Sequence, residues 1–388
     1  MFKLAGILLF NAQKLLLLAS YWLCKPFVKP ETDLWVIGVH EIANNTHNIS
    51  KVFDKHYSVN FSTNKYYLQN KYNFSVKGTR FLNEHLLHFL IGPMLLGYLA
   101  NRASNFFYIG NMGFLFHLAD GREFEFSFLK KHHKQIVTFF CGTDIRSLVL
   151  SLEHARQHKI DVMATYQSMT SPKLVAPGYE AYLKKLAGSA DKYADHIFNA
   201  PVDQIAYIKR DVHPFVYFYP DERFARNDSK FSNINKIKIV HAPSSPFIKG
   251  TQIVRAAIKK LQVMGYDFDY IEVINMPNSV VIDHLKTAHI VVNELYAFVP
   301  GLFSVEAMAA HCAVITSADR NMEPTLAEGA NEAWFVTKYW EMFDHLKLLL
   351  DQPELMKRYA DSGYEWAYKN CRTSQSRQAV KTLLDKTA

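Results

Sequence analysis

Short apolar runs alternate with helical stretches throughout residues 237–316, and this alternation limits the possible folds more than any other feature of the chain. The runs have the length of strands, and the segments between them have helical periodicity. We expect strands over residues 237–240, 269–274, 290–292 and 313–316, and helices over residues 251–264, 280–287 and 304–310. Strands and helices in this order predict a parallel sheet with helices on both faces.

The first half of the chain shows the same pattern less regularly. Strand-like runs occur at residues 33–39, 105–109, 135–140 and 196–199, and helical stretches at 81–100 (kinked or ended at Gly92-Pro93), 151–158 and 180–187. The polar, aperiodic segment 219–236 separates the two halves. Since 388 residues are too many for one ordinary core, we predict an α/β fold of two doubly wound, Rossmann-like domains facing each other across a cleft. The domains span residues 29–220 and 237–340, and residues 341–388 form a helical tail.

The net charge of +8 comes from an excess of basic residues in the first half. A basic domain suits nucleic acid, an anionic membrane surface or an anionic substrate. No nucleic-acid-binding motif accompanies the charge, which favours the membrane or the substrate. The four cysteines are far apart and form no CxxC motif. This argues against a disulfide framework and a structural zinc site, and it favours a reducing compartment such as the cytoplasm.

Residues 1–28 form a separate apolar segment. Asn11, Gln13 and Lys14 interrupt it, so it is a poor spanning helix. Lys3, Lys14 and Lys25 recur every eleven residues and therefore share one stripe of a helix whose other faces are apolar. This pattern is typical of an amphipathic helix that lies in the membrane interface with its lysines toward anionic headgroups. The alternatives are a helix packed on the protein's own core and a single-span anchor.

Two loops of the second domain carry residues suited to a nucleotide diphosphate. In parallel α/β sheets ligands bind in the loops that follow the strands. The loop after residue 240 holds Ser244, Lys249 and Gly250 at the start of a helix, where free amides and a lysine attract phosphate. The second loop reads Pro300-Gly301-Leu-Phe-Ser304-Val-Glu306-Ala-Met-Ala, and its carboxylate, on an otherwise apolar helix, needs partners such as ribose hydroxyls. The alternatives are a solvated lysine and a carboxylate that stabilises a helix start.

Lys249-Gly-Thr followed by Gly301-x-x-x-x-Glu306-Ala-Met-Ala resembles the retaining GT-B glycosyltransferases of family 4 (glycosyl transferases group 1), in particular bacterial enzymes of capsule and surface-polysaccharide assembly. The resemblance implies that Lys249 holds the donor's diphosphate, that Glu306 holds the ribose, and that amides near Gly301 to Ser304 assist. The family usually has another Glu eight residues before Glu306, where this chain has Phe298. Glu294, four residues before Phe298, is the candidate substitute, since related subgroups hold an acidic or amide residue nearby.

The first domain has its own candidate residues. The stretch Cys141-Gly142-Thr143-Asp144-Ile145-Arg146 is similar to a Gly-Ser-Asp-x-Arg loop of the same subgroup. Asp144 and Arg146 either act on the acceptor or donor as catalytic groups or form a structural pair. His40 and Asn45, after the first strand, are candidates for the same cleft wall, together with Gly142. No stretch has metal-ligand spacing, which predicts an enzyme without a metal or other cofactor.

The sequence therefore predicts a glycosyltransferase that moves a sugar from a UDP- or GDP-sugar to a lipid-linked or growing surface-polysaccharide acceptor, with retention implied by the resemblance. Its expected place is peripheral, on the cytoplasmic face of the inner membrane. The other candidates are a nucleotide-sugar 2-epimerase of the same fold and a non-catalytic nucleotide-sugar-binding relative. The basic first half and the interfacial helix favour the transferase, since an epimerase acts on soluble substrates.

Overall fold

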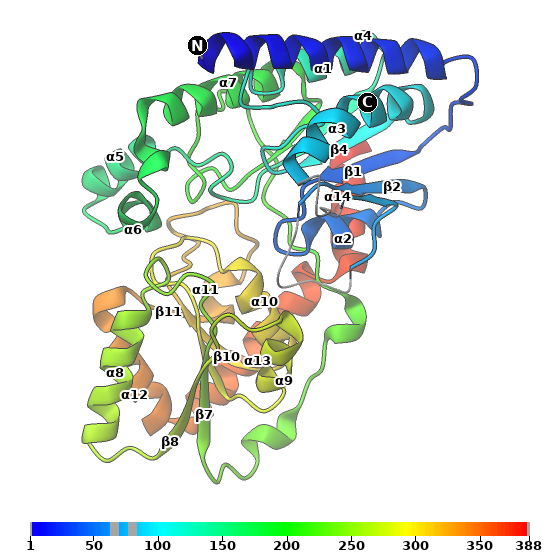
Figure 1. Ribbon diagram of the computed structural model, residues 1–388. Coiled ribbons are helices and arrows are strands. Elements are labelled where there is room, and N and C mark those ends of the chain that lie inside the picture. Colours follow the sequence, from blue (N-terminus) through cyan, green and yellow to red (C-terminus); the bar gives the residue numbers. More distant parts are fainter. Residues whose placement is uncertain (1, 63–69, 77–83, 386–388) are drawn as a thin grey trace.

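The computed structural model describes residues 2–62, 70–76 and 84–385, and it has two α/β domains stacked end to end (Figure 1). The N-terminal domain contains a six-stranded sheet in the order β3-β2-β1-β4-β5-β6, and the C-terminal domain a five-stranded sheet in the order β11-β10-β9-β7-β8. All strand pairs in both sheets are parallel. The predicted fold of two doubly wound domains is confirmed.

All eight expected strands are present, with small shifts at their ends. They are β1 (Trp35–Val39), β4 (Asn105–Ile109), β5 (Gln135–Phe139), β6 (His196–Phe198), β7 (Ile237–His241), β8 (Phe268–Glu272), β9 (Ile290–Val292) and β10 (Ala313–Thr316). Sequence reasoning missed β2 (His56–Asn60) and the edge strands β3 (Phe74–Ser75) and β11 (Phe335–Val336). The strands β3 and β11 have only two residues each, and β2 alternates polar and apolar side chains without a continuous apolar run.

Helices of the N-terminal domain are α2 (Asn45–Ser50), α3 (Glu84–Arg102), α4 (Glu123–Lys131), α5 (Leu148–His158), α6 (Met163–Thr170) and α7 (Pro177–Tyr193). The expected helix over 81–100 does not end at Gly92-Pro93, because α3 continues through Pro93 to Arg102; residues 81–83 lie outside the described part. Tertiary packing explains this continuation. A Cβ at Gly92 would lie 2.1 Å from the carbonyl oxygen of Phe114, so the helix fits closely against that loop.

Helix α1 (Phe2–Cys24) lies along the N-terminal domain, on the side away from the C-terminal domain (Figure 1). One stripe of it, formed by Phe10, Gln13, Leu17 and Tyr21, is buried against the domain. The opposite face is exposed and apolar. The helix thus packs on the protein's own core with one face and leaves the other free, and its place at a membrane stays a prediction.

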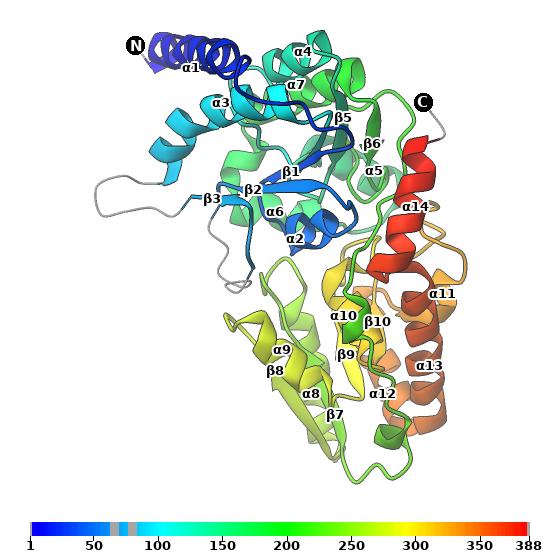
Figure 2. The same ribbon diagram turned by 90° about the vertical axis from the view of Figure 1, so that its right-hand side faces the viewer.

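The C-terminal domain contains α8 (Thr251–Val263), α9 (Asn278–Leu285), α10 (Gly301–Ala309) and α11 (Ala330–Ala333). The expected helical tail consists of α12 (Met342–Asp351), α13 (Pro353–Asn370) and α14 (Thr373–Asp385). Helix α14 returns to the N-terminal domain (Figure 2), where Val380 and Leu384 pack in a core with Ile37 and Phe107.

The chain therefore passes between the domains twice, and the two passages are hydrogen-bonded to each other. The N–H of Tyr219 donates to the Cys371 carbonyl at 2.8 Å, and the N–H of Thr373 donates to the Tyr219 carbonyl at 2.9 Å. The segment expected to be a linker, 219–236, contains only two short 3-10 turns, Asp221–Arg223 and Asp228–Phe231. It forms one half of this double connection.

Candidate functional site

A cleft of about 1060 Å³ lies between the two domains. Residues that directly follow β1, β4 and β5 form one wall, and residues that follow β7, β8 and β9 contribute to the other. Of the residues expected in the site, seven line this cleft: His40, Asp144, Ser244, Lys249, Glu294, Gly301 and Glu306. Asn45, Gly142, Arg146, Gly250 and Ser304 do not line it. The carboxyl ends of parallel strands bring the first group together from distant parts of the chain.

Lys249 lies in the loop between β7 and α8, and its ammonium group faces an acidic partner across the cleft wall. Lys249 Nζ lies 2.5 Å from Glu294 Oε1 and 3.4 Å from Asn293 Oδ1. Gly250 adopts φ 74° directly before α8, and a Cβ there would lie 2.9 Å from Leu295 Cδ1. Gly250 therefore allows the tight turn that aims Lys249 at the cleft, although it does not line the cleft itself.

Glu306 lies in the second turn of α10, because this helix begins at Gly301, three residues earlier than expected. Its side chain is almost fully buried, with 4% exposed, and Oε1 accepts a hydrogen bond from Asn278 Nδ2 at 2.9 Å. Burial raises the pKa of Glu306 to about 7. A carboxylate accepts several hydrogen bonds, so this group has capacity left for hydroxyl donors in the cleft.

The start of α10 is held by residues that sequence reasoning did not single out. Gly301 adopts φ 68°, and its N–H donates to Tyr217 Oη at 3.1 Å. Ser304 is fully buried, and its Oγ accepts from Asn293 Nδ2 at 2.9 Å. Ser304 thus attaches α10 to the end of β9 beneath the cleft surface. No pattern in the sequence pointed to Tyr217, since it lies outside both loops.

Asp144 is the acidic residue at the end of β5. Both carboxylate oxygens accept from the N–H of Cys141 at 3.0 Å, and burial raises the pKa of Asp144 to about 6. Gly142, with φ 135°, allows the loop to fold back in this way. The carboxylate lines the cleft, so it is positioned to accept a proton or a hydrogen bond from a bound hydroxyl.

Arg146 does not share the cleft with Asp144. Its side chain is 5% exposed and pairs with Asp203, with Nη2 2.6 Å from Oδ2 and Nε 2.7 Å from the backbone carbonyl oxygen. The second oxygen of Asp203 accepts from the N–H of Phe298 at 2.7 Å, across the domain interface. Arg146 and Asp203 therefore form a buried ion pair within the N-terminal domain, and Asp203 makes the contact to the C-terminal domain. The partner of Arg146 is Asp203 and not Asp144, so the arrangement differs from the structural pair of Asp144 and Arg146 that the sequence offered as the alternative to a catalytic role.

Phe298, at the position where the resemblance implies a glutamate, also belongs to the domain interface. Its ring packs in a cluster with Leu148, Val162 and Leu174 of the N-terminal domain. A further carboxylate, that of Glu323, is completely buried in the interface and accepts from the N–H groups of Val202 and Asp203 at 2.8 and 2.9 Å. Phe298 itself does not line the cleft, whereas Glu294, four residues before Phe298, does.

Two of the residues expected after β1 differ in their placement. His40 lines the cleft, and burial lowers its pKa to about 4, so it is neutral at pH 7. Asn45 is buried behind the wall and donates to Cys141 Sγ at 3.6 Å. Glu41, which was missed, also lines the cleft. Its oxygens accept from the N–H groups at the start of α2, at 3.2 and 3.0 Å, and burial raises its pKa to about 7.

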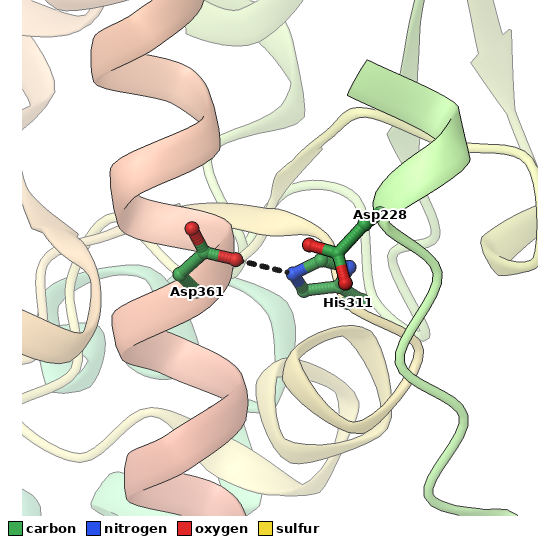
Figure 3. A group of neighbouring side chains, drawn as sticks. All are labelled: Asp228, His311 and Asp361. Atoms are coloured by element: carbon green, nitrogen blue, oxygen red, sulfur yellow. Dashed lines mark hydrogen bonds and ion pairs between the residues drawn. The ribbon is translucent and has the colours of Figure 1, made fainter. Parts of the chain in front are cut away.

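A group of ligand-type side chains, Asp228, His311 and Asp361, lies outside the cleft lining (Figure 3). His311 Nδ1 accepts from the N–H of Asn227 at 3.1 Å, so Nε2 carries the proton and donates to Asp361 at 2.8 Å. Arg226 and Lys357 form ion pairs with both aspartates. With both imidazole nitrogens and both carboxylates engaged, this group is an ion-pair network and not a metal site.

The chain matches no protein-family model, and no curated protein matches its sequence. Solved structures match it over nearly its whole length. That of Anabaena Alr3699/HepE in complex with UDP-glucose aligns over 91% of this chain and 99% of its own, with a TM-score of 0.55 and 12% identity. The sucrose-phosphate synthase from Thermosynechococcus elongatus aligns over 92% and 98%, with a TM-score of 0.60 and 10% identity. WaaG, a glycosyltransferase involved in lipopolysaccharide biosynthesis, aligns over 90% and 98%, with a TM-score of 0.53 and 12% identity.

The alignments cover both domains of this chain, and its two parallel sheets with their helices match the two-domain GT-B fold of these structures. The chain has the GT-B fold. At such low sequence identity the likeness extends to the fold alone. Membership of family 4 and of the surface-polysaccharide subgroup stays a prediction.

Proposed function

We propose that this GT-B protein is a glycosyltransferase that moves a sugar from a UDP- or GDP-sugar to a lipid-linked or growing surface-polysaccharide acceptor. The observation that carries the proposal is the presence of Lys249 and Glu306 on the same wall of one large cleft. A cation and a nearly buried carboxylate in the loops after the strands match the two ends of a nucleotide diphosphate. The UDP-glucose bound in the Anabaena structure supports a donor of this class.

In this function Lys249 binds the diphosphate and Glu306 accepts hydrogen bonds from the ribose hydroxyls. The departing diphosphate is stabilised by the lysine and the amides at the start of α10, so the reaction needs no metal ion. Asn278 donates to Glu306 and so orients the carboxylate. The base lies toward the loop after β8, where Val273, Asn275 and Met276 line the cleft.

The transferred sugar lies between Glu294 and the wall of the N-terminal domain. Glu294 takes the role implied for the residue at position 298, because its side chain lines the cleft and that of Phe298 does not. Asp144, whose pKa burial raises to about 6, accepts a hydrogen bond from the acceptor hydroxyl. Retention at the anomeric carbon and membership of family 4 are parts of the same proposal, supported by the Lys249 and Glu306 motifs.

The acceptor is membrane-bound in this proposal, and the protein is peripheral on the cytoplasmic face of the inner membrane. The exposed apolar face of α1 supports this, because such a face is costly in water. Four cysteines without a disulfide agree with a reducing compartment.

The experiment is incubation of the purified full chain with UDP- and GDP-sugars, with and without a bacterial lipid extract, followed by analysis of the nucleotide and the sugar. Release of UDP or GDP that increases with the lipid extract is expected. Conversion of the donor to a second nucleotide-sugar without release would make the protein an epimerase. If nucleotides raise the thermal stability of the protein but no donor is turned over, the protein binds nucleotide-sugars without catalysis. If no nucleotide raises the thermal stability, the proposed nucleotide site is wrong.

A further inference from the structure

Among the residues that the structure describes, the largest group of exposed large apolar side chains is on α1. Leu8, Leu15 and Trp22, seven residues apart, lie on its outward face, with Leu15 68% and Trp22 60% exposed. Ile7, Leu9, Leu18 and Leu23 flank them and are also exposed. A soluble surface seldom carries a continuous apolar area of this length, so the face has a partner.

The adjacent helix α3 extends this apolar surface. Leu86, Leu90 and Met94 recur every four residues and are 42%, 43% and 49% exposed, so they form one stripe. Ser20 Oγ of α1 donates to the Met94 carbonyl at 2.7 Å, which brings the stripe alongside α1. A Cβ at Gly97 would lie within 2.8 Å of the Leu17 carbonyl oxygen, so the two helices are in close contact. Figure 2 shows α1 and α3 side by side at the outer edge of the N-terminal domain.

Gln13 fixes α1 to the domain. It is 1% exposed, its Nε2 donates to the Phe89 carbonyl of α3 at 2.9 Å, and its Oε1 accepts from the N–H of Phe116 at 2.8 Å. By length and composition, Gly6–Cys24 is long enough to cross a membrane. Crossing would detach α1 from α3 and leave the Gln13 amide unpaired in hydrocarbon. The buried glutamine therefore favours a helix that stays on the domain surface.

Basic side chains lie along one border of this surface. Lys14 Nζ lies 4.4 Å from the centre of the Phe10 ring and 4.9 Å from that of Phe124 on α4. Directly after the C-terminal end of α1, Lys25 Nζ lies 4.8 Å from the centre of the Trp22 ring. Tyr21 Oη contacts His132 Nδ1 at 3.0 Å, which brings the exposed Lys131 to the same end. An apolar face bordered by lysines complements an anionic lipid surface.

We propose that α1 and α3 together form a two-helix platform that lies flat in the interface of an anionic membrane. The platform consists of Leu8, Leu15 and Trp22 of α1 and Leu86, Leu90 and Met94 of α3. This inference deepens the membrane partner of the proposed function and rests on it. It adds α3 to the binding surface and excludes α1 as a membrane-spanning anchor.

The contribution of α3 is tested with the double variant Leu90→Glu/Met94→Glu in co-sedimentation with vesicles of phosphatidylglycerol and phosphatidylcholine. The partition coefficient is expected to fall at least about tenfold, because two apolar contacts are lost and two negative charges face anionic lipid. The matched control is Val263→Glu/Met264→Glu at the end of α8, where the residues are 77% and 50% exposed. The control variant is expected to bind as the wild type does. Sedimentation of the α3 variant at the wild-type level would overturn the platform.

The flat orientation is tested with single labels at Leu8→Cys, Leu15→Cys and Trp22→Cys in a Cys24→Ser background, read by depth-dependent quenching in the same vesicles. A flat helix gives equal depths at the three positions. A spanning helix gives depths that differ by about 10 Å for each seven residues. Such a gradient would overturn the flat orientation.

The wild type and the Leu90→Glu/Met94→Glu variant also distinguish the membrane from a second copy of the chain as the partner, and the platform from the proposed nucleotide site. If the wild type is a dimer in solution that Leu90→Glu/Met94→Glu dissociates, and it does not bind vesicles, a second copy covers this face and the proposal is wrong. If the wild type is stabilised by nucleotides but does not bind vesicles, the membrane proposal is wrong and the proposed donor site remains. If it binds vesicles but is not stabilised by nucleotides, the proposed donor site is wrong and the membrane platform remains.

Discussion

Lys249 and Glu294 form an ion pair at 2.5 Å on the wall of the cleft, between the loop after β7 and the end of β9. Both side chains are largely buried, so the pair compensates two charges that would each be costly alone. In the proposed function a donor's diphosphate approaches this lysine and competes with Glu294 for it. The pair therefore links donor binding to the position of the Glu294 carboxylate, which lies beside the transferred sugar in the proposed function.

Glu294→Gln is expected to raise the affinity for UDP or GDP several-fold while it lowers the rate of transfer. Removing the carboxylate frees Lys249 for the diphosphate, since like charges at short range oppose binding. Titration calorimetry and a donor turnover assay measure the two effects. Equal loss of affinity and turnover would contradict the competition between Glu294 and the diphosphate.

Lys249→Ala is expected to weaken binding of nucleoside diphosphates about ten- to a hundredfold, the range for a hydrogen bond to a charged group. The corresponding nucleosides, which lack phosphate, serve as the control ligands and should bind with unchanged affinity. Calorimetry with both ligand types tests this. A similar loss for the nucleosides would mean that the substitution disturbs the whole site.

Glu306→Gln is expected to stabilise the empty protein at high pH and to weaken nucleotide binding. The folded pKa of Glu306 is raised from 4.5 to about 7. The folded state therefore holds a proton that the unfolded state has lost, and the free energy of unfolding declines as pH rises between these two values. The variant lacks this decline, so its free energy of unfolding at pH 8 should exceed that of the wild type by on the order of 1–3 kcal/mol.

Urea unfolding at pH 4.5 and pH 8 measures this difference, which should vanish at the lower pH. Nucleotide affinity at pH 8 is measured on the same samples and should fall, because a carboxamide accepts fewer hydrogen bonds from ribose than a carboxylate. A variant less stable than the wild type at pH 8 would show that Glu306 is stabilised by its partners as an anion.

Phe298→Glu, which restores the residue implied by the resemblance, is expected to destabilise the protein by about 2–4 kcal/mol without raising turnover. The new carboxylate would lie among Leu148, Val162 and Leu174 in the domain interface. Phe298→Leu keeps an apolar side chain there and is the control, with an expected cost of about 1 kcal/mol. Thermal unfolding and the donor assay decide the outcome. A stable and faster Phe298→Glu enzyme would show that position 298 reaches the sugar.

Much of the fold and half of the site followed from the sequence, because strand and helix periodicity and the loops after strands are local features. Lys249 and Glu306 lie where this logic placed them. Arg146 and Phe298 show its limit, because both occupy motif positions and neither side chain lines the cleft. The Arg146 guanidinium pairs with Asp203, and the Phe298 ring packs in the domain interface while its backbone N–H donates to Asp203. That interface joins residues from both domains, so no local pattern predicts it. Pro93 predicts a kink or an end of its helix on local grounds, yet α3 continues through it. Its close packing on α1 and on the loop at Phe114, which accompanies this continuation, is equally non-local.

The paired passages at Tyr219 and Cys371 to Thr373 determine how the cleft is able to open. Because both covalent connections run through this one line, any relative movement of the domains has to bend or twist the chain there. A rotation about this line would move the cleft edge farthest from it by the greatest distance. Opening would separate Tyr166 from Tyr296, whose rings stack at 4.0 Å across the interface. The stacking of these two rings is therefore a local measure of whether the two domains are closed on each other.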